Sequence, residues 1–351
     1  MVMSRISPTR LRVLGTGSAL PGESIDNQEL LVSLGQFCSI DKVRLANKYA
    51  DRLGIKSRHV SRDLHKPRSG ARKGMDAPSL CCEALGASDA LAGISYLLGH
   101  TSTPHTLLPS NIAWVADKLD YEGPYAELRQ ACTGFASALS MAAGLIAENP
   151  AEKVGIVGSE NGSPYFEIDN KFADREQLIN FVQMGDGAGS IVLTAAGEQE
   201  SGIISDIFTG QIGSGMQPGI SIHGAGSVGR ACESGLPYFQ HNARQVRKNG
   251  GRLIEKGVDT ILSQGYSLGD FDWVIPHQAN GHIASLMEAR FPELQGKVYV
   301  TADTLGNLGS AAIWVSFDRL RNSGLLAAGQ KVLVLGAEAS KYLYGGFVYT
   351  H

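Results

Sequence analysis

The apolar residues of this chain fall into two kinds of pattern. Residues 94–100, 154–160, 271–277 and 332–338 are short, nearly continuous apolar runs bounded by glycine, proline or polar residues. Such runs are typical of strands buried on both faces, and in α/β proteins helices cover those strands. Longer stretches between them are rich in the small and apolar residues of packed helices. The pattern therefore predicts layered α/β structure with buried sheets.

A helix that is apolar on nearly all sides is predicted for residues 132–146. Its many small residues would let it lie deep in a core. Cys132 stands at the expected first turn, after the polar Arg129 and Gln130. Free backbone N–H groups and the positive end of the helix dipole stabilise a thiolate there, so we expect a pKa below the usual value of about 8.5. Cys132 is a candidate nucleophile, and the alternative is a buried small residue of the core.

The second part of the chain echoes the first, in the same order and at nearly constant spacing. The run that ends in His100 resembles the run that ends in His277. The run that ends in Glu160 resembles the run that ends in Glu338. Glycine-rich closing strands are expected after both glutamates, at residues 185–193 and 344–349. Matched elements in one order indicate a duplicated α/β unit, in which we expect His100 to be structural.

The duplication would bring distant residues into one site. Small-residue helices open near Cys132 in the first half and near Asn307 in the second. If the halves, expected at residues 1–200 and 201–351, pack about a pseudo-twofold axis, the starts of these helices meet. Cys132 would then lie opposite Asn307, with His277 at the end of a neighbouring strand. These three residues are the predicted catalytic group.

Composition and charge narrow the class of protein. The chain has 351 residues, of which 43% are hydrophobic and 19% charged, and this suits one large or two fused α/β units. Its net charge of −3 argues against nucleic acid as a partner. It shows neither an apolar signal core at its start nor a run of about 18 apolar residues, so we expect a cytoplasmic protein without a membrane span.

The cysteines do not indicate a metal site or a disulfide framework. There are five, at positions 38, 81, 82, 132 and 232, and none shows C-x-x-C spacing. Reduced thiols and no bound metal are therefore expected.

A thiol, an imidazole and an amide can share one reaction on thioesters. Papain-like proteases use the same three groups, but the local sequence around their cysteine is absent here. In a duplicated α/β fold, Cys132 would take an acyl group from a thioester. His277 and Asn307 would donate hydrogen bonds to the carbonyl oxygen of a second thioester as enolate charge develops there. Each such donor can be worth about 3–4 kcal/mol in the transition state.

Three motifs resemble those of β-ketoacyl-acyl-carrier-protein synthase III, a condensing enzyme of the thiolase fold. They are Gln-Ala-Cys-Thr-Gly-Phe at 130–135, Ile-Pro-His-Gln-Ala-Asn at 275–280 and Leu-Gly-Asn-Leu-Gly-Ser-Ala-Ala at 305–312. Residues 15–21, 53–59 and 185–189 also match, and the resemblance runs from about residue 12 to the C-terminus.

This resemblance implies a fold, a reaction and partners. The fold is a five-layered αβαβα arrangement of two thiolase-like halves. The reaction is a decarboxylative Claisen condensation of an acyl thioester with a malonyl- or β-ketoacyl-type thioester, by way of an acyl group on Cys132. It needs no cofactor, because the substrates are carried on the phosphopantetheine of acyl carrier protein or coenzyme A. A homodimer in fatty-acid or specialised polyketide-like biosynthesis is expected.

Two departures from the family concern the coenzyme A site. Lys48 stands where primer-loading members have a tryptophan that stacks on coenzyme A, although Arg52 is retained as a candidate binding residue. Residues 163–174 replace a segment that carries an arginine in the family. Both changes favour a specialised enzyme that takes its substrates from a carrier protein.

A third departure concerns the pocket wall. The family has a Gly-Gly-Gly-Phe run here, whose backbone helps to form the oxyanion hole, whereas this chain has Glu338-Ala-Ser-Lys-Tyr342. The Ser340 N–H remains an oxyanion-hole candidate. The Glu338 carboxylate would crowd the wall, as an extra base or an orienting group.

Residues 239–256 carry a concentration of basic side chains against one acid. The basic residues are Arg244, Arg247, Lys248, Arg252 and Lys256. Four of them recur every fourth residue, so a continuous helix would present a basic stripe, although Gly250 and Gly251 weaken that helix. The functional interpretation is a docking face for acidic carrier protein and its phosphate, and the alternative is a solvated charged face.

Other functions stay open at this point. A ketosynthase could cyclise its product, or a non-decarboxylating acyltransferase could pass the acyl group to another nucleophile. A non-catalytic subunit of a condensing heterodimer is a further alternative. The Gly-x-Gly-x-x-Gly match at 224–229 lacks the helix and the acidic residue that a nicotinamide site needs, so we expect a loop there.

Overall fold

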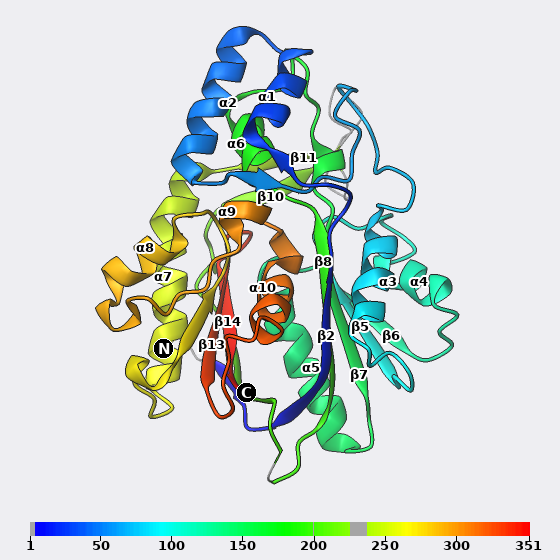
Figure 1. Cartoon of the computed structure of the whole chain (residues 1–351), viewed down its shortest axis with the longest axis vertical. Helices are drawn as coiled ribbons and strands as arrows, with labels where there is room; N and C mark the ends of the chain where they lie inside the picture. Colours follow the sequence, from blue (N-terminus) through cyan, green and yellow to red (C-terminus); the bar gives the residue numbers. More distant parts are fainter. Residues whose placement is uncertain (1–3, 199, 225–236) are drawn as a thin grey trace.

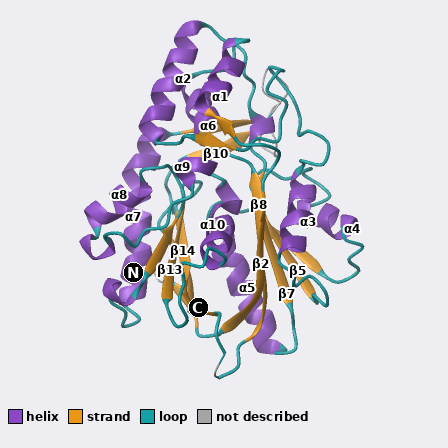
Figure 2. Ribbon diagram, in the orientation of Figure 1, coloured by secondary structure: helices purple, strands orange, loops and turns teal. Residues whose placement is uncertain are grey.

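The computed structural model describes residues 4–198, 200–224 and 237–351 (Figure 1). Its main sheet has ten strands, and the links within it run from β12 at one edge to β6 at the other. The sheet forms two arms, with helices α5 (Gly134–Glu148) and α10 (Ala312–Arg321) between them (Figures 1 and 2). Further helices cover the outer faces of both arms, so the predicted five-layered α/β arrangement is confirmed.

The first arm has five strands. In sheet order they are β2 (Leu11–Ala19), β8 (Gly187–Ala195), β7 (Val154–Glu160), β5 (Tyr96–His100) and β6 (Tyr125–Leu128). Strand β5 runs parallel to β6 and β7, whereas β8 runs antiparallel to β7 and β2.

The second arm repeats this order. It consists of β9 (Ile203–Gln211), β14 (Leu343–Thr350), β13 (Lys331–Glu338) and β12 (Trp273–Pro276), and a parallel bridge from Val274 to Val298 stands in the outermost place. Strand β12 is parallel to β13, as β5 is to β7. Strand β1 (Arg5–Ser7) pairs with β9, and a short β2–β9 contact joins the arms. The strands that echo each other in sequence thus occupy equivalent positions in the two arms. Residue 200, the expected boundary between the two halves, lies between β8 and β9.

Glycines let the central helices lie close against the sheets. A Cβ atom on Gly189 of β8 would lie 2.6 Å from the Cβ atom of Trp314 in α10. A Cβ atom on Gly345 of β14 would lie 2.7 Å from that of Ala136 in α5. The aromatic rings of Trp314 and Phe135 then meet edge to face between the arms, with ring centroids 5.9 Å apart.

The outer layers and the cap complete the fold. Helices α3 (Ala77–Ala87) and α4 (Asn111–Lys118) cover the first arm, and α7 (Ala243–Leu262) and α8 (Ile283–Arg290) cover the second. The cap contains α1 (Asn27–Gly35), α2 (Ile40–Leu53), α6 (Arg175–Gln183), β3 (Ile25–Asp26), β4 (Ser57–Arg58), β10 (Ile220–His223) and β11 (Tyr238–His241). Short helical turns are η1 (Ser163–Tyr165), η2 (Leu268–Asp270), η3 (Pro292–Leu294), α9 (Ala302–Leu305) and η4 (Gly309–Ala311).

Helix α7 is continuous, so the two glycines do not break it. Asn242 caps its first turn by accepting a hydrogen bond from the Gln245 N–H. Gly250 and Gly251 face open space, while Leu253, Val258 and other apolar residues of the helix are buried against the second arm. Burial of that face outweighs the weak helix propensity of glycine.

Within the described ranges, none of the helices is long and apolar enough to span a membrane. Over the same residues, His, Cys, Asp and Glu side chains form no cluster that could hold a metal ion.

Candidate active site

Cys132 lies in the turn between β6 and α5, and it is half-buried. The Gly134 N–H donates to the Ala131 carbonyl, and the helix begins at Gly134. Cys132 therefore precedes the helix, rather than lying in its first turn as the sequence pattern suggested. Thr133, the residue between them, is the helix cap.

The buried His100 leaves no room for a side chain at Gly134, the first residue of α5. A Cβ atom on Gly134 would lie 2.4 Å from Nδ1 of His100. The Trp314 indole donates a hydrogen bond of 2.8 Å to Nε2 of His100. Burial lowers the pKa of His100 to about 3, so the imidazole is neutral and able to accept this bond. His100 thus joins the two central helices, as a structural residue does.

His277 follows strand β12 and is only 8% exposed. Its backbone N–H donates to the Leu335 carbonyl of β13 at 2.7 Å. The neighbouring Gln278 side chain fixes the loop, since it donates to the Pro276 carbonyl and accepts from the Thr301 N–H. Burial lowers the pKa of His277 to about 4, so the ring is neutral at pH 7 and can donate from one nitrogen.

Asn307 lies in the turn between α9 and η4. Its backbone N–H donates to the Gln183 carbonyl at 2.8 Å. Its side-chain Oδ1 accepts the Gly309 N–H at 2.9 Å. Gly306 and Gly309 have φ angles of +71° and +48°, a region that glycine adopts readily. Because Oδ1 is engaged inside the turn, the NH₂ end of the amide is the part that can donate to a ligand.

Contacts between the halves bring the segments that carry these residues together. The hydroxyl oxygen of Ser310, three residues after Asn307, lies 3.4 Å from the carbonyl oxygen of Gln130, two residues before Cys132. Thr133 donates to Glu338, which lies three residues beyond the Leu335 carbonyl that holds His277. The three predicted catalytic segments therefore converge at the carboxyl ends of the parallel strands of both arms.

The electrostatic environment of Cys132 corrects the prediction of an acidic thiol. Burial raises the pKa of the Cys132 thiol well above its usual value, and the Glu338 and Glu160 carboxylates raise it further. A thiolate there would be poorly solvated and would face negative charge. Cys132 therefore rests as a thiol, and the expectation of a lowered pKa was wrong.

A cavity of about 280 Å³ opens at Cys132. Glu338 and Ser340 form part of its wall, as expected from the sequence, and Arg129 also reaches it. Its apolar lining comes from Leu107, Tyr165, Ile220, Ile222 and Phe239. The cavity thus offers an apolar space for an acyl chain and a polar wall beside the sulfur.

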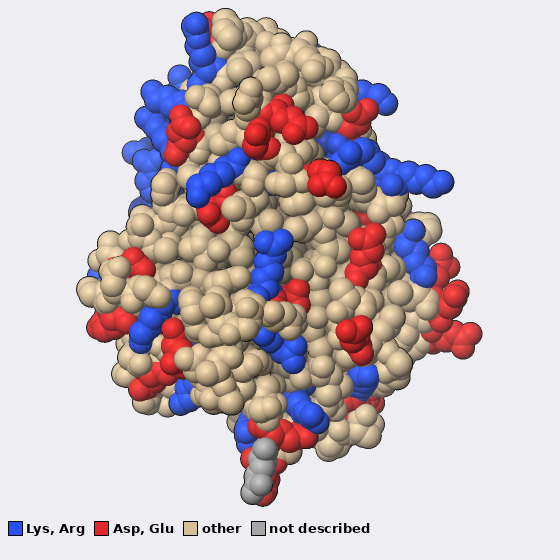
Figure 3. Space-filling view, in the orientation of Figure 1, with Lys and Arg blue, Asp and Glu red and all other residues tan. Residues whose placement is uncertain are grey.

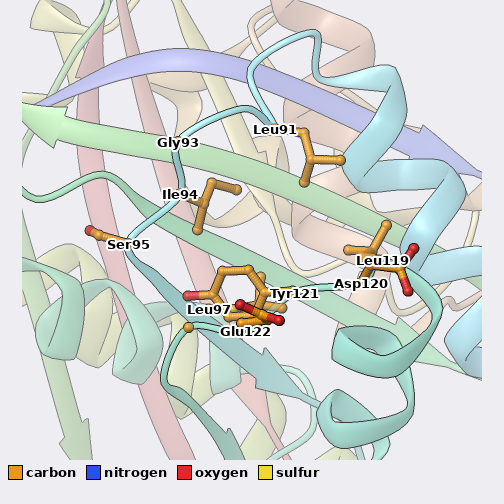
Figure 4. A pocket seen from close by; sticks show the side chains of 10 residues that line it. Leu91, Gly93, Ile94, Ser95, Leu97, Leu119, Asp120, Tyr121 and Glu122 are labelled. Carbon is orange, nitrogen blue, oxygen red and sulfur yellow. The ribbon is translucent and has the colours of Figure 1, made fainter.

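Two other cavities lie away from Cys132. One of about 540 Å³ adjoins the first, shares Pro104 and Tyr165 with it, and carries Arg72 and Lys73. The other, of about 440 Å³, lies at the opposite, amino-terminal end of β5 (Figure 4). Its lining of Leu97, Leu119, Tyr121 and their neighbours includes none of the predicted site residues.

The predicted basic residues are exposed and lie outside the cavity. Arg52 is in the last turn of α2, next to Leu53, whose carbonyl accepts from Gly281 in the loop after His277. Figure 3 shows Lys and Arg side chains gathered on the left edge of the molecule, over α2. The exposed basic residues of α7 are Arg244, Arg247, Lys248, Arg252 and Lys256.

The first turn of α7 is close to the cavity wall. The Asn242 N–H donates to the Gly219 carbonyl at 2.7 Å, and the Gly219 N–H donates to the Ala339 carbonyl at 3.0 Å. Farther along the helix, Lys256 pairs with Asp259 at 3.2 Å. Residues 225–229 of the Gly-x-Gly-x-x-Gly match, and Cys232, lie outside the described residues.

The chain matches the models of two families that together describe one kind of enzyme. Residues 126–210 match 3-oxoacyl-[acyl-carrier-protein (ACP)] synthase III, and residues 262–349 match the C-terminal part of the same synthase. The β-ketoacyl-[acyl-carrier-protein] synthase III of Bordetella petrii is 27% identical over 332 residues, which cover 92% of this chain and 93% of that protein. The enzyme of the same name from Neisseria meningitidis is 28% identical over 346 residues, covering 96% and 97%.

Solved structures share the fold over nearly the whole chain. AbyA1, a tetronic acid condensing enzyme, is 25% identical with a TM-score of 0.82, covering 96% of this chain and 99% of that one. The 3-oxoacyl-(acyl carrier protein) synthase III of Pseudomonas aeruginosa PAO1 is 23% identical with a TM-score of 0.78, covering 97% and 98%. Fold and matches place the chain among the thiolase-fold condensing enzymes. Within that class its sequence is similar to the β-ketoacyl-[acyl-carrier-protein] synthase III enzymes over nearly the whole chain, as the sequence motifs predicted.

Proposed function

We propose that the chain condenses two acyl thioesters, with Cys132 as the acyl acceptor and His277 and Asn307 as donors to the second thioester. The observation that carries this proposal is the set of contacts that joins the segments of His277 and Asn307 to the segment of Cys132. Cys132 itself lines a cavity, whereas His277 and Asn307 are not among the residues that line it. The engaged Oδ1 of Asn307 supports it, because only the NH₂ end of that amide remains for a substrate oxygen.

In the first half-reaction, the Cys132 sulfur attacks the carbonyl carbon of an acyl thioester. The bond between that carbon and the carrier sulfur breaks, and the proton of the Cys132 thiol passes to the leaving carrier thiolate. Since Cys132 rests as a thiol, acylation is coupled to this proton transfer. The Ser340 N–H, in the cavity wall, is our candidate donor to the oxyanion.

In the second half-reaction, a malonyl-type thioester loses carbon dioxide, and its carbonyl oxygen takes up the enolate charge. One N–H of the neutral His277 ring and the Asn307 NH₂ group donate to that oxygen. The resulting carbanion attacks the acyl-cysteine carbonyl. A carbon–carbon bond forms, the carbon–sulfur bond to Cys132 breaks, and the released thiolate takes up a proton from solvent.

We further propose that an acyl carrier protein delivers these substrates in the cytoplasm to a homodimer. The exposed basic residues of α7 and Arg52 support this, since acidic proteins and phosphate groups bind to such clusters. Delivery by coenzyme A would use the same basic side chains. The free thiols of Cys38, Cys81 and Cys82 suit a reducing compartment.

The second candidate function keeps the fold and the acyl-cysteine but changes the fate of the acyl group. The enzyme would cyclise its product, or pass the acyl group to another nucleophile without decarboxylation. Glu338 favours this candidate, because a carboxylate beside Cys132 can accept the proton of an incoming nucleophile.

Incubation of the intact protein with a panel of acyl thioesters, followed by mass spectrometry, tests the proposed function. We expect one acyl adduct per chain, absent from Cys132→Ala, and a carbon–carbon condensation product after malonyl-carrier is added. An acyl adduct without that product would favour the second candidate. The absence of any adduct, with Cys132 still open to iodoacetamide, would leave a non-catalytic partner subunit as the better account.

A further inference from the structure

Two buried glutamates hold the starts of the two central helices in the same way. Glu160 ends β7 in the first arm, and Glu338 ends β13 in the second. Oε2 of Glu160 accepts the backbone N–H and the hydroxyl of Ser310, both at 2.9 Å, where η4 leads into α10. Oε2 of Glu338 accepts the backbone N–H of Thr133 at 3.1 Å and its hydroxyl at 2.7 Å, where α5 begins. Each half therefore caps the central helix of the other.

The other oxygens of these two carboxylates differ. Oε1 of Glu160 accepts two hydroxyl groups, from Ser102 at 2.7 Å and from Thr103. Oε1 of Glu338 accepts one, from Ser340. Among the residues that the structure describes, no other donor reaches this oxygen. Glu338 is thus one donor short of its counterpart in the first half.

The open position on Glu338 belongs to the cavity at Cys132. Glu338 is 3% exposed and lines that cavity, whereas Glu160 does not. Over the described part of the chain, no lysine or arginine forms an ion pair with Glu338. A buried carboxylate oxygen with a vacant acceptor site is unfavourable, so a ligand that donates a hydrogen bond there binds better than one that does not.

We propose that the acyl group loaded onto Cys132 carries a hydroxyl or amino group near its carbonyl carbon, and that this group donates to Oε1 of Glu338. The inference rests on Cys132 as the acyl acceptor and names the class of acyl group. A plain alkyl group would cover the carboxylate with C–H groups and leave Oε1 with the Ser340 hydrogen bond alone. Sites built around a hydrogen bond discriminate strongly against analogues that lack the donor.

The pantetheine arm of the carrier has amide N–H groups, and these are a second source of a hydrogen-bond donor for Oε1 of Glu338. A matched pair of thioesters separates the two sources. Butanoyl and 3-hydroxybutanoyl thioesters of N-acetylcysteamine share the amide and differ by one hydroxyl group. Propanoyl and 2-hydroxypropanoyl thioesters form a second pair, which places the hydroxyl one carbon closer.

The experiment offers both members of a pair at equal concentration to the full chain and measures the two adducts on Cys132 by mass spectrometry. We expect the hydroxyacyl adduct to form at least about tenfold faster than the alkyl adduct in one of the pairs. In Glu338→Ala we expect the ratio to fall to within about threefold of one. In the matched variant Glu160→Gln, which alters the equivalent cap outside the cavity, we expect the ratio to persist.

Each other outcome overturns a distinct claim. Equal loading of both members of both pairs by the unchanged chain means that a pantetheine amide or a water molecule fills the site, and the proposal fails. A preference that survives in Glu338→Ala excludes Glu338 as its source. Absence of all adducts, while iodoacetamide still modifies Cys132, overturns the proposed function itself rather than this inference. Circular dichroism of each variant confirms that it folds.

Discussion

The amide of Asn307 shows how one turn can assign a chemical role to a side chain. Its Oδ1 accepts the Gly309 N–H within the turn, so the donor end faces away from this bond. In the proposed reaction, His277, a neutral buried imidazole, is the second donor. Neither group takes part in bond formation at Cys132, which lies on the other half of the molecule. Under the proposed function, the two half-reactions would therefore depend on different residues.

Replacing Asn307 with alanine tests this division. We expect Asn307→Ala to be acylated on Cys132 within about threefold of the normal rate. Malonyl-thioester decarboxylation should fall by a factor of about 10²–10³, the usual effect of losing one donor to a developing oxyanion. Adduct formation by mass spectrometry and release of labelled carbon dioxide measure the two steps. Equal losses in both steps would show that Asn307 serves the fold rather than the enolate.

The two carboxylates near Cys132 make a second prediction at this scale. Glu338 raises the pKa of the Cys132 thiol, because ionisation of the sulfur would place two negative charges close together. Glu338→Gln removes one charge and keeps the shape, so the pH at which iodoacetamide alkylation of Cys132 is half-maximal should move downward. Ser340→Ala, which keeps the charge, is the control. An unchanged or higher midpoint in Glu338→Gln would contradict this account.

The sequence was sufficient to name candidate residues for the site but not to predict how they are charged. The motifs around Cys132, His277 and Asn307 are local, and each can be read in a few residues. The pKa of Cys132 is raised first by burial and then by Glu338, whose carboxylate reaches Thr133 across 205 positions of sequence. A local argument from the helix dipole could not include that charge. The echo of Glu160 and Glu338 was the available signal that both strands end in a buried carboxylate.

Among the elements, helix α7 carries its charge on the face opposite its packing. Its apolar residues lie against the second arm, and its basic residues are exposed. The sequence predicted this stripe every fourth residue but left the continuity of the helix open at Gly250 and Gly251. Continuity follows from the apolar residues beyond the glycines, since their burial holds the helix together.

Charge reversal on α7 tests the docking face. We expect the double variant Arg244→Glu, Lys248→Glu to raise the KM for acyl carrier protein by about tenfold or more, because the surface then repels an acidic partner. Loading from a small N-acetylcysteamine thioester should be unchanged. The difference in KM should shrink as salt is added, since exposed charges are screened.

Lys118→Glu provides the matched control for α7. Lys118 is an exposed residue at the end of α4, on the outer face of the first arm. Lys118→Glu replaces one positive side chain with a negative one, as each substitution on α7 does, and leaves α7 unchanged. If it raises the KM for the carrier protein as much as a reversal on α7 does, the effect comes from overall charge and not from a docking face.

On the scale of the whole molecule, the halves hold each other at several buried points. Glu160 and Glu338 cap the helices of opposite halves. Asp318 of α10 accepts the hydroxyl groups of Thr16 and Ser18 in β2, at 2.8 and 2.7 Å. The sequence predicted the duplication, because strands and helices echo one another. It could not predict these bonds, since each joins unlike residues that only the packing of the arms brings together.

One buried histidine between the halves gives the fold a measurable response to acid. Burial lowers the pKa of His100 to about 3, whereas an unfolded histidine titrates near 6.5. Between these values the unfolded chain binds a proton that the folded chain does not, so this group stabilises the fold above about pH 6.5 and its contribution is lost as the pH falls. Glu160 and Asp186, whose pKa values burial raises, act in the opposite direction. The pH dependence of the free energy of unfolding of the unchanged protein therefore does not by itself give the contribution of His100.

The variant His100→Gln isolates the contribution of His100, because glutamine offers an acceptor for the Trp314 N–H but does not titrate. We expect the free energy of unfolding of the unchanged protein, minus that of the variant, to decrease by about 1.4 kcal/mol per pH unit from about pH 6 to pH 4. Urea unfolding at several pH values, followed by tryptophan fluorescence, measures both. A difference that stays constant over this range would mean that His100 is already protonated in the fold, and its hydrogen bond from Trp314 would then have to be abandoned.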